Sequence, residues 1–243
     1  MKQYHHATCL RPSCAKQKTE QRPQLIALVG GSGAGKTWIA RRLQRALGPT
    51  ITRLSLDDFY QDHSTLPQPL RERVNLDHPR AIDWRSLESA LHSCRAGRRV
   101  HVPQFSLATR TRLSQSRVLT PAPLIVVDGL WVLLRREVRE LFDFRVYLEC
   151  PTQLRLERRL ARDLGEDGRN ADSLRRQFWR VIAPMHERYV APQVGWADIV
   201  MEQPPSEEEV HNLAETIRAL IEPESPYRET RFESQPPMHA QRF

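Results

Sequence analysis

Apolar residues along the chain form five short runs, separated by stretches whose apolar positions recur at helical spacing. The runs cover residues 24–29, 51–56, 124–127, 144–148 and 199–201, and several are apolar at almost every position. Continuous apolar runs of this length are typical of parallel strands that helices cover on both faces. We therefore predict five parallel strands.

Two helices can be placed by their boundary signals. The stretch Lys36–Leu47 has helical spacing and stops at Gly48-Pro49, a dipeptide that ends helices. Ser206 and Glu209 form a capping box ahead of an apolar stripe at helical spacing, made by Val210, Leu213, Ala214, Ile217 and Leu220. Strands that alternate with helices predict an α/β fold, a doubly wound parallel sheet with helices on both faces. In such a sheet, ligands gather at the carboxyl ends of the strands.

Both ends of the chain lack this periodicity. Residues 1–22 show no repeating apolar pattern, and residues 223–243 carry four prolines among charged residues. We predict a disordered leader over 1–22, one domain over 23–222 and a disordered tail over 223–243.

The segment that joins the first strand to the first helix fits a phosphate-binding loop at every required position. Residues 30–37 read G-x-x-x-x-G-K-T, in the strand–helix context that supports this assignment (Gly30, Gly31, Ser32, Gly33, Ala34, Gly35, Lys36 and Thr37). Glycines let backbone N–H groups surround phosphate oxygens, and the helix N-terminus adds partial positive charge. Lys36 is expected to reach the β- and γ-phosphates, and the Thr37 hydroxyl to hold Mg²⁺. The chain is predicted to bind a nucleoside triphosphate.

Carboxylates follow two of the predicted strands. Asp57 and Asp58 end the second strand, and Asp128 ends the buried run Leu124–Val127. A carboxylate after such a run completes the Mg²⁺ shell in phosphate-loop enzymes, directly or through water. Neighbouring residues of an extended chain alternate in direction, so only one of Asp57 and Asp58 is expected to face the γ-phosphate. The other is expected to cap the chain or meet solvent. An alcohol acceptor needs a carboxylate near its hydroxyl, and this pair is the candidate.

Composition and charge limit the partners. The net charge of +8 would suit nucleic acid, but arginines near a phosphate loop also suit an anionic small molecule. Arg155, Arg158, Arg159 and Arg162 lie at i, i+3, i+4 and i+7, which predicts a phosphate clamp on one helix face. No apolar run approaches the roughly 20 residues of a membrane helix, so no membrane partner is expected. Four cysteines without zinc or disulfide spacing predict a cytoplasmic location.

With these motifs in order, the chain resembles the uridine kinase (uridine–cytidine kinase) family, within the phosphoribulokinase/uridine kinase group of P-loop kinases. The resemblance extends from about Leu25 to Val200. It rests on residues 30–37, D-D-F-Y at 57–60, N-L-D-H-P at 75–79, V-P-Q-F at 102–105, V-D-G at 127–129, R-R-L-A-R-D at 158–163 and P-M at 184–185. It implies a P-loop kinase fold with a helical, arginine-rich lid, and Mg²⁺-ATP-dependent phosphorylation of a nucleoside 5′-hydroxyl, with uridine or cytidine as the acceptor.

The resemblance also implies residue roles. Asp57 matches the catalytic base, which also lies by the metal, and Asp128 matches a metal-shell glutamate that is longer by one methylene. Asp77 matches the carboxylate that holds the ribose hydroxyls. The remaining matches are residues that contact the nucleoside (Arg159, Arg169 and Gln177) and a lid arginine that faces the phosphates (Arg162).

The segment that recognises the base departs from the family. Phe105 and Arg110 stand where the family has a tyrosine and a histidine, so stacking is kept while a polar partner is lost and a permanent charge is gained. Asp167 stands where a lid arginine is common. A site that loses hydrogen-bonding partners also loses discrimination between acceptors.

Several alternatives therefore stay open. Arg110 would also suit a phosphorylated sugar or a different riboside as acceptor. A nucleotide switch lacks its expected N-K-x-D motif here, and a nucleic-acid-dependent ATPase lacks any recognisable nucleic-acid module. The sequence leaves open GTP as an alternative donor and a homo-oligomer as the assembly.

Overall fold

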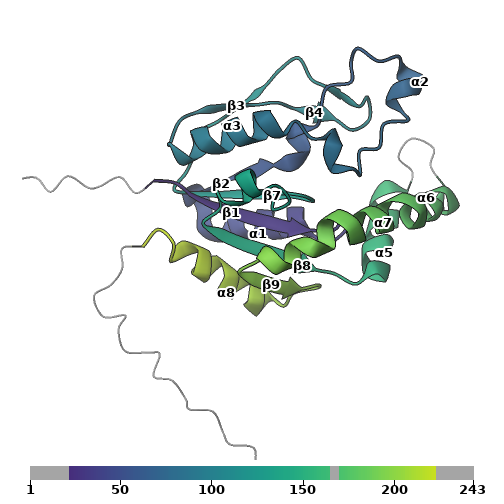
Figure 1. The fold of residues 1–243 in the computed structure, drawn as a ribbon. Helices are drawn as coiled ribbons and strands as arrows, with labels where there is room; N and C mark the ends of the chain where they lie inside the picture. The colour runs from purple at the N-terminus through teal and green to yellow at the C-terminus, as the bar shows by residue number, and fades with distance from the viewer. Residues whose placement is uncertain (1–21, 165–169, 223–243) are drawn as a thin grey trace, which may run out of the picture.

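The computed structural model describes residues 22–164 and 170–222 (Figure 1). The predicted tail, nearly all of the predicted leader, and the predicted site residue Arg169 with Asp167 lie outside these residues.

A five-stranded parallel sheet forms the centre, in the order β2-β7-β1-β8-β9. Its strands are β1 (Gln24–Gly30), β2 (Ile51–Ser55), β7 (Leu124–Gly129), β8 (Phe144–Glu149) and β9 (Ile199–Glu202). All five predicted strands are thus confirmed, with ends that differ by one or two residues. The strand order reverses at β1, so the carboxyl ends of β1, β2 and β7 meet where the first phosphate-loop glycine lies.

Alternation along the strands divides the core between the two faces of the sheet. In β1, Leu25 and Ala27 belong to one buried cluster, and Ile26 and Leu28 belong to the other. Helices α1 (Lys36–Leu47) and α8 (Glu207–Arg218) cover the face of Ile26. Helix α3 (Trp84–Arg95) covers the opposite face (Figure 1). The doubly wound architecture is confirmed, because each face has its own helical layer.

The predicted helix boundaries hold. Helix α1 spans Lys36–Leu47 with Gly48 as its C-cap, and α8 follows a complete capping box between Ser206 and Glu209. None of the helices among the described residues is long and apolar enough to span a membrane.

Between β2 and β7 the chain builds structure that the apolar pattern does not predict. Two small antiparallel pairs form there, β3 (Val100–Val102) with β6 (Arg117–Leu119) and β4 (Phe105–Ser106) with β5 (Thr111–Arg112). A short helix, α2 (Gln68–Arg71), lies beside them (Figure 1). Two of the residues expected to meet the acceptor lie here, Phe105 in β4 and Arg110 between β4 and β5.

A second helical region follows β8. It contains α5 (Thr152–Asp163), α6 (Ala171–Gln177) and α7 (Ala183–Met185), with wider helical turns over Phe178–Ile182 and His186–Val190. A 3₁₀ segment over Ala191–Trp196 leads to β9, and the short α4 (Arg136–Arg139) precedes β8. Helices α5 and α6 project beyond the end of the sheet where the phosphate loop lies (Figure 1).

Candidate active site

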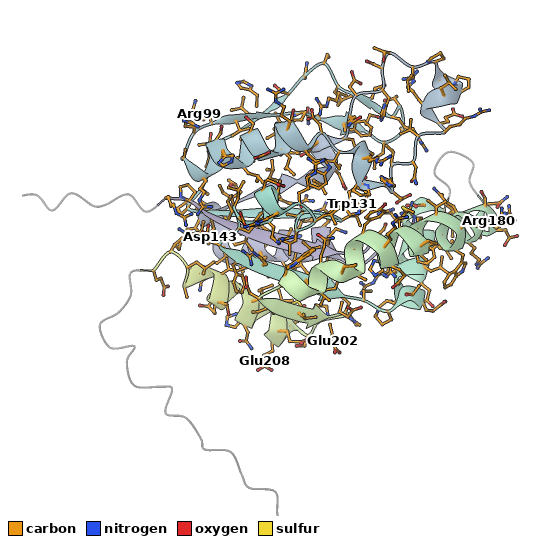
Figure 2. All side chains as sticks on the ribbon, in the orientation of Figure 1. Arg99, Trp131, Asp143, Arg180, Glu202 and Glu208 are labelled. Carbon is orange, nitrogen blue, oxygen red and sulfur yellow. The ribbon has the colours of Figure 1, made fainter. Side chains whose placement is uncertain are left out.

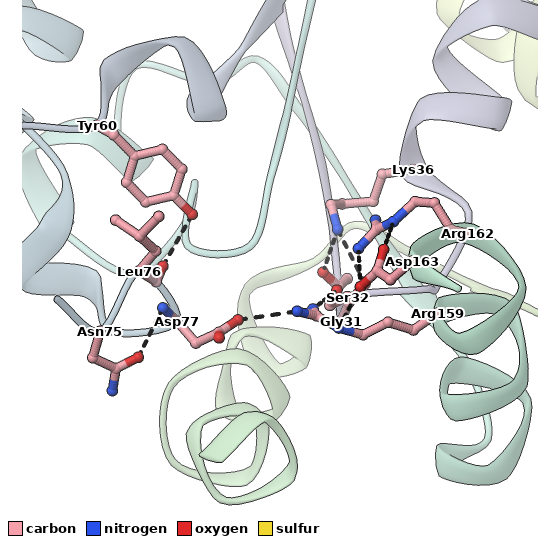
Figure 3. Close-up of polar contacts among 11 residues, drawn as sticks. Gly31, Ser32, Lys36, Tyr60, Asn75, Leu76, Asp77, Arg159, Arg162 and Asp163 are labelled. Carbon is pink, nitrogen blue, oxygen red and sulfur yellow. Dashed lines mark hydrogen bonds and ion pairs between the residues drawn. The ribbon is translucent and has the colours of Figure 1, made fainter. Parts of the chain in front are cut away.

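The phosphate loop, Gly30–Thr37, leaves β1 and enters α1 as predicted. Gly33 has φ +84°, and a Cβ there would lie 2.5 Å from the Arg155 carbonyl oxygen, so the loop follows α5 too closely for a side chain. The Lys36 ammonium donates to the carbonyls of Gly30 and Gly31 at 3.0 Å each (Figure 3). Burial lowers the pKa of Lys36, and the Asp57 and Asp128 carboxylates oppose this. Lys36, which is predicted to bind the β- and γ-phosphates, thus holds its ammonium group against the backbone of the loop.

Close packing brings two of the predicted carboxylates to the loop. Asp128 is the second-last residue of β7, beside β1, and Asp57 lies in the 3₁₀ segment η2 (Leu56–Phe59) that follows β2. A Cβ on Gly129 would lie 2.4 Å from Leu56 Cβ, so the missing side chain lets η2 approach β7. The V-D-G motif therefore positions Asp57 as well as Asp128.

Asp57 and Asp58 have different surroundings, although they lie in the 3₁₀ segment η2 and not in the extended chain that the prediction assumed. Protein surrounds the Asp57 carboxylate on several sides although the residue keeps an exposed face, and this desolvation raises its pKa while Lys36 opposes the rise. Asp58 pairs with Arg117 of β6 at 3.5 Å. The expectation that one of the two would cap the chain or face solvent was incomplete, because Asp58 ties η2 to β6.

Oxygen donors suited to a divalent cation converge beside the phosphate loop. Asp128 is 3% exposed, and its carboxylate accepts from Arg53 Nε at 2.7 Å and from Arg53 Nη2 at 3.0 Å. The same Nη2 lies 3.4 Å from the Thr37 hydroxyl. A single cationic group thus touches both predicted metal ligands. Hydroxyl and carboxylate oxygens are the donors that Mg²⁺ accepts, so this pair fits the ion. Among the described residues, no group of three or more His, Cys, Asp and Glu side chains is placed to hold a metal.

Helix α5 carries arginines to the loop. Arg159 Nη1 donates to the Ser32 hydroxyl at 2.7 Å and lies 4.0 Å from Asp77 Oδ1 (Figure 3). Its Nε pairs with Asp163 at 3.2 Å, which fixes the guanidinium. Arg162 binds Asp163 through Nε at 2.6 Å and lies near Lys36, whose pKa its charge lowers. The predicted contact residues Arg159 and Arg162 therefore both reach the loop.

Arg155 departs from the predicted clamp. Its side chain is buried beneath the loop, 1% exposed, and donates to the Cys150 carbonyl at 3.3 Å and the Thr152 hydroxyl at 3.1 Å. Arg155 lies on the same helix as the other three arginines, but its buried side chain is held by Cys150 and Thr152 inside the protein. It therefore does not face the site with Arg159 and Arg162. Arg158 donates to the Gly33 carbonyl at 3.3 Å. Arg155 and Arg158 thus pack against the backbone of the phosphate loop and do not face the site.

Asp77 and Ser32 of the loop line opposite sides of one cleft, and Asp77 lies on a segment held by its own polar residues. Its backbone N–H donates to Asn75 Oδ1 at 2.9 Å, and His78 meets the Tyr189 hydroxyl at 3.1 Å. The Tyr60 hydroxyl donates to the Leu76 carbonyl at 3.0 Å (Figure 3). Desolvation raises the pKa of Asp77, and Arg159 opposes the rise. One residue of each motif, Tyr60 of D-D-F-Y and His78 of N-L-D-H-P, thus helps to hold the segment that carries Asp77.

The other expected acceptor residues occupy different places. Phe105 stacks at a tilt on Tyr60, with ring centroids 5.1 Å apart, and so lies by the Asp77 segment. Arg110 adopts φ 56° in the β4–β5 turn and donates to the carbonyls of Arg71 at 3.1 Å and Val74 at 2.6 Å. Gln177 is half-buried at the end of α6, away from the carbonyls that Arg110 contacts in the segment 71–74.

A small, mostly apolar pocket joins Asp77 to Ser32 of the loop. Its wall is completed by Leu130, Trp131, Ile182, Met185, His186 and Val190. Trp131 is 1% exposed and lies well inside the molecule (Figure 2). Burial lowers the pKa of His186 to about 4, with Arg155 and Lys36 adding to the effect, so the imidazole is neutral.

Buried Gln193 supports this wall. Its amide accepts from the Leu133 N–H at 2.9 Å and donates to the carbonyls of Leu130 at 2.7 Å and Tyr189 at 2.8 Å. The sequence analysis missed Gln193, Trp131 and His186. No periodic signal marks a single buried polar residue, although His186 adjoins the P-M motif at 184–185.

The model of the phosphoribulokinase/uridine kinase family matches residues 25–209. The chain belongs to this family. A uridine kinase from Halobacterium salinarum is 31% identical over 194 residues, which span 80% of this chain and 86% of that protein. A uridine kinase from Deinococcus deserti is 34% identical over 181 residues, which span 74% of this chain and 87% of that protein.

Solved structures support the fold. A putative fructose transport system kinase from Silicibacter sp. TM1040 has a TM-score of 0.62 at 22% identity, covering 75% of this chain and 91% of that one. The phosphoribulokinase from Rhodobacter spheroides has a TM-score of 0.56 at 13% identity, covering 75% and 70%. The family membership makes the protein an enzyme, a phosphotransferase that acts on a hydroxyl group.

Proposed function

We propose that this family member transfers the γ-phosphoryl group of ATP to the 5′-hydroxyl of uridine or cytidine. The observation that carries the proposal is the position of Arg159, whose Nη1 reaches Ser32 of the phosphate loop at 2.7 Å and Asp77 at 4.0 Å. One guanidinium thus joins the site for the donor phosphates to the carboxylate expected to hold the ribose. Relatives named uridine kinase, at 31% and 34% identity, support a nucleoside acceptor.

The transfer follows from the residues around the cleft. Lys36 and the loop amides bind the β- and γ-phosphates, and Asp77 positions the acceptor by its ribose hydroxyls. As the acceptor oxygen forms its bond to the γ-phosphorus, Asp57 accepts the hydroxyl proton. The bond from that phosphorus to the β–γ bridging oxygen breaks, and ADP leaves. A raised pKa brings Asp57 closer to the working pH and makes it a better base.

Charge that develops on the phosphoryl oxygens needs cations. Arg159 and Arg162 supply two of them from α5. Magnesium would be held by Thr37 and Asp128, with Asp57 close by, and supplies a divalent charge to the phosphate oxygens. Asp128 is shorter than glutamate by one methylene, and Arg53 already contacts both of its carboxylate oxygens. Direct contact between Asp128 and the ion would therefore require Arg53 to move away.

Contacts of Arg110 weigh against an anionic acceptor. Its guanidinium is committed to the carbonyls of Arg71 and Val74, so its charge stabilises the segment ahead of Asp77. A phosphorylated sugar remains the alternative, because the same charge lowers the pKa of Asp77 and therefore reaches the acceptor side of the cleft.

An acceptor panel tests the proposal. Purified protein with Mg²⁺ and ATP is offered uridine, cytidine, adenosine and sugar phosphates, and the uridine reaction is repeated with GTP. We expect uridine or cytidine to give the highest kcat/KM. Asp57→Asn should lower kcat by about a thousandfold while the KM values change little, since it removes the proton acceptor and leaves the phosphate loop and Asp77 in place. Asp58→Asn, the matched control, should stay within about tenfold of the wild type. Highest activity on a sugar phosphate, or an Asp57→Asn variant that keeps its kcat, would refute the proposal.

A further inference from the structure

Arg53 lies where the sheet directs it toward the predicted metal ligands. In the β2–β7 register Arg53 is opposite Val126, and Asp128 follows two residues later on the same face of β7. Helix α1 covers this face, and Thr37 stands in its first turn. Arg53, Asp128 and Thr37 therefore converge because of strand register, without any adjustment of a loop.

The contact between Arg53 and Asp128 is a two-point ion pair in a poorly solvated place. Nε and Nη2 of the arginine address separate oxygens of the carboxylate, at 2.7 and 3.0 Å. Asp128 is 3% exposed, and in such surroundings an unpaired carboxylate is costly. Paired arginine and carboxylate groups hold each other most firmly in this geometry. Arg53 therefore neutralises Asp128, and a metal ion that binds Asp128 directly has to replace it.

Two further carboxylates, those of Asp57 and Asp58, attract the Arg53 guanidinium. The hydrogen bonds with Asp128 raise the pKa of Arg53 most, and the charges of Asp57 and Asp58, in the segment that follows β2, attract the guanidinium as well. Asp58 already has Arg117 as a partner at 3.5 Å. After Arg53 moves away from Asp128, the attraction of Asp57 and Asp58 would still compensate part of its charge.

We propose that Arg53 is a positioning residue that covers the metal carboxylate and withdraws from Asp128 only when the metal arrives with nucleotide. A divalent ion alone then has to break the Arg53–Asp128 pair without help, and it binds weakly. A metal–nucleotide complex brings phosphate oxygens as further ligands and additional contacts to Lys36 and the loop, and these offset the loss of the pair. The inference rests on the proposed function only in its use of a metal–nucleotide donor.

Metal binding without acceptor tests this inference. Mn²⁺, which is detected directly by electron paramagnetic resonance, replaces Mg²⁺ and is titrated into the full chain without nucleotide. We expect Arg53→Met to bind Mn²⁺ at least tenfold more tightly than the wild type. Arg53→Met/Asp128→Asn should lose this gain, because the exposed carboxylate is its source. Arg42→Met is the matched control, since Arg42 pairs with Glu207 on the surface between α1 and α8.

A second variant and a measurement with bound nucleotide keep the inference testable if Arg53→Met does not fold. Arg53→Lys keeps the charge but loses the two-point contact, so it should bind Mn²⁺ with intermediate affinity, and it serves if Arg53→Met fails to fold in thermal melting. With a non-hydrolysable ATP analogue present, Asp128→Asn should weaken Mn²⁺ binding at least tenfold.

Two results would overturn the inference. One is an Arg53→Met variant, or where that does not fold an Arg53→Lys variant, with unchanged Mn²⁺ affinity. The other is an analogue complex that is indifferent to Asp128→Asn, because Arg53 would then have kept the carboxylate. Neither measurement needs an acceptor, so a failed acceptor panel would refute the proposed function and leave this inference standing.

Discussion

Gly33 holds a backbone conformation with φ +84°, and its missing side chain makes room for the Arg155 carbonyl. Gly97 has a similar φ of +69°, but nothing lies within 4 Å of a Cβ placed there. The two positions share the cost of a left-handed conformation, about 1–2 kcal/mol for an L-residue. They differ only in the contact with α5.

Alanine at each of these glycines separates the two effects. Gly97→Ala should lower the free energy of unfolding by about 1–2 kcal/mol and leave nucleotide affinity unchanged. Gly33→Ala should cost more stability and weaken binding of an ATP analogue at least tenfold, because the loop has to move away from α5. Urea unfolding and calorimetric titration measure the two quantities. Equal nucleotide affinity in both variants would mean that the loop tolerates the shift.

His186 makes stability depend on pH. Its pKa falls from 6.5 to about 4 on folding, because burial disfavours the charged imidazole. The unfolded chain therefore binds more protons between these values, and stability declines as pH falls through 6.5 toward 4. Between pH 7 and pH 5 the loss is about 2 kcal/mol.

His186→Phe removes this titration. Urea unfolding at pH 7 and pH 5 should show a smaller decline for the variant than for the wild type. The raised pKa values of Asp57 and Asp77 act in the opposite direction, and both proteins share them, so the difference between the two slopes isolates His186. Identical slopes would show that the imidazole is protonated as easily in the folded chain as in the unfolded one.

Helix α5 links the two halves of the cleft through Arg159. Arg159→Met removes a charge that contacts Ser32 and faces Asp77, so kcat/KM should fall about a hundredfold for both the nucleotide and the acceptor. Arg176→Met on the exposed side of α6 should leave both unchanged. Steady-state kinetics with each substrate varied in turn provides the measurement. A loss confined to the nucleotide would restrict Arg159 to the phosphate loop.

Elements that contain a long apolar run or a repeating apolar pattern could be predicted from the sequence, and elements that contain neither could not. Residues 24–29 and 124–127 form inner strands of the parallel sheet, where every position is covered, so a continuous apolar run identified them. Strand β4 has only two residues, Phe105 and Ser106, which is too short for any alternation to appear. The hairpins that carry the acceptor side of the cleft were therefore missed.

The residues of the candidate site divide in the same way, into those that a motif identified and those that no motif contains. Motifs that repeat across a family placed Lys36, Asp77 and Arg159 around one cleft. Arg53 belongs to no such motif. A signal was nevertheless present, because Arg53 interrupts the α1-facing side of a buried strand between Ile51 and Ser55. A charged residue in that position requires a partner of opposite charge, and the register with β7 supplies Asp128.

The described residues form three buried apolar clusters that differ in extent, and this difference predicts which region unfolds locally first. Two large clusters cover the faces of the sheet, whereas beneath α5 and α6 the buried cluster contains only Leu156, Phe178 and Ile182. Arg155 adds a buried Nη1 without a partner in the described residues. Regions with little buried apolar surface unfold locally at lower free energy than the core.

Hydrogen exchange tests this ranking with a matched pair of helices. Both α5 and α8 have 12 residues. Four apolar residues of α8 are buried (Val210, Leu213, Ala214 and Ile217), whereas Leu156 is the one apolar residue of α5 that is buried. Amide hydrogens of α5 should exchange at least tenfold faster than those of α8 and of β1. An ATP analogue should slow α5 and leave α8 unchanged, because Arg158 and Arg159 contact the phosphate loop. If α5 were as protected as β1 without nucleotide, the arginines would be held rigidly before the substrate binds, and closure of α5 would contribute nothing to nucleotide affinity.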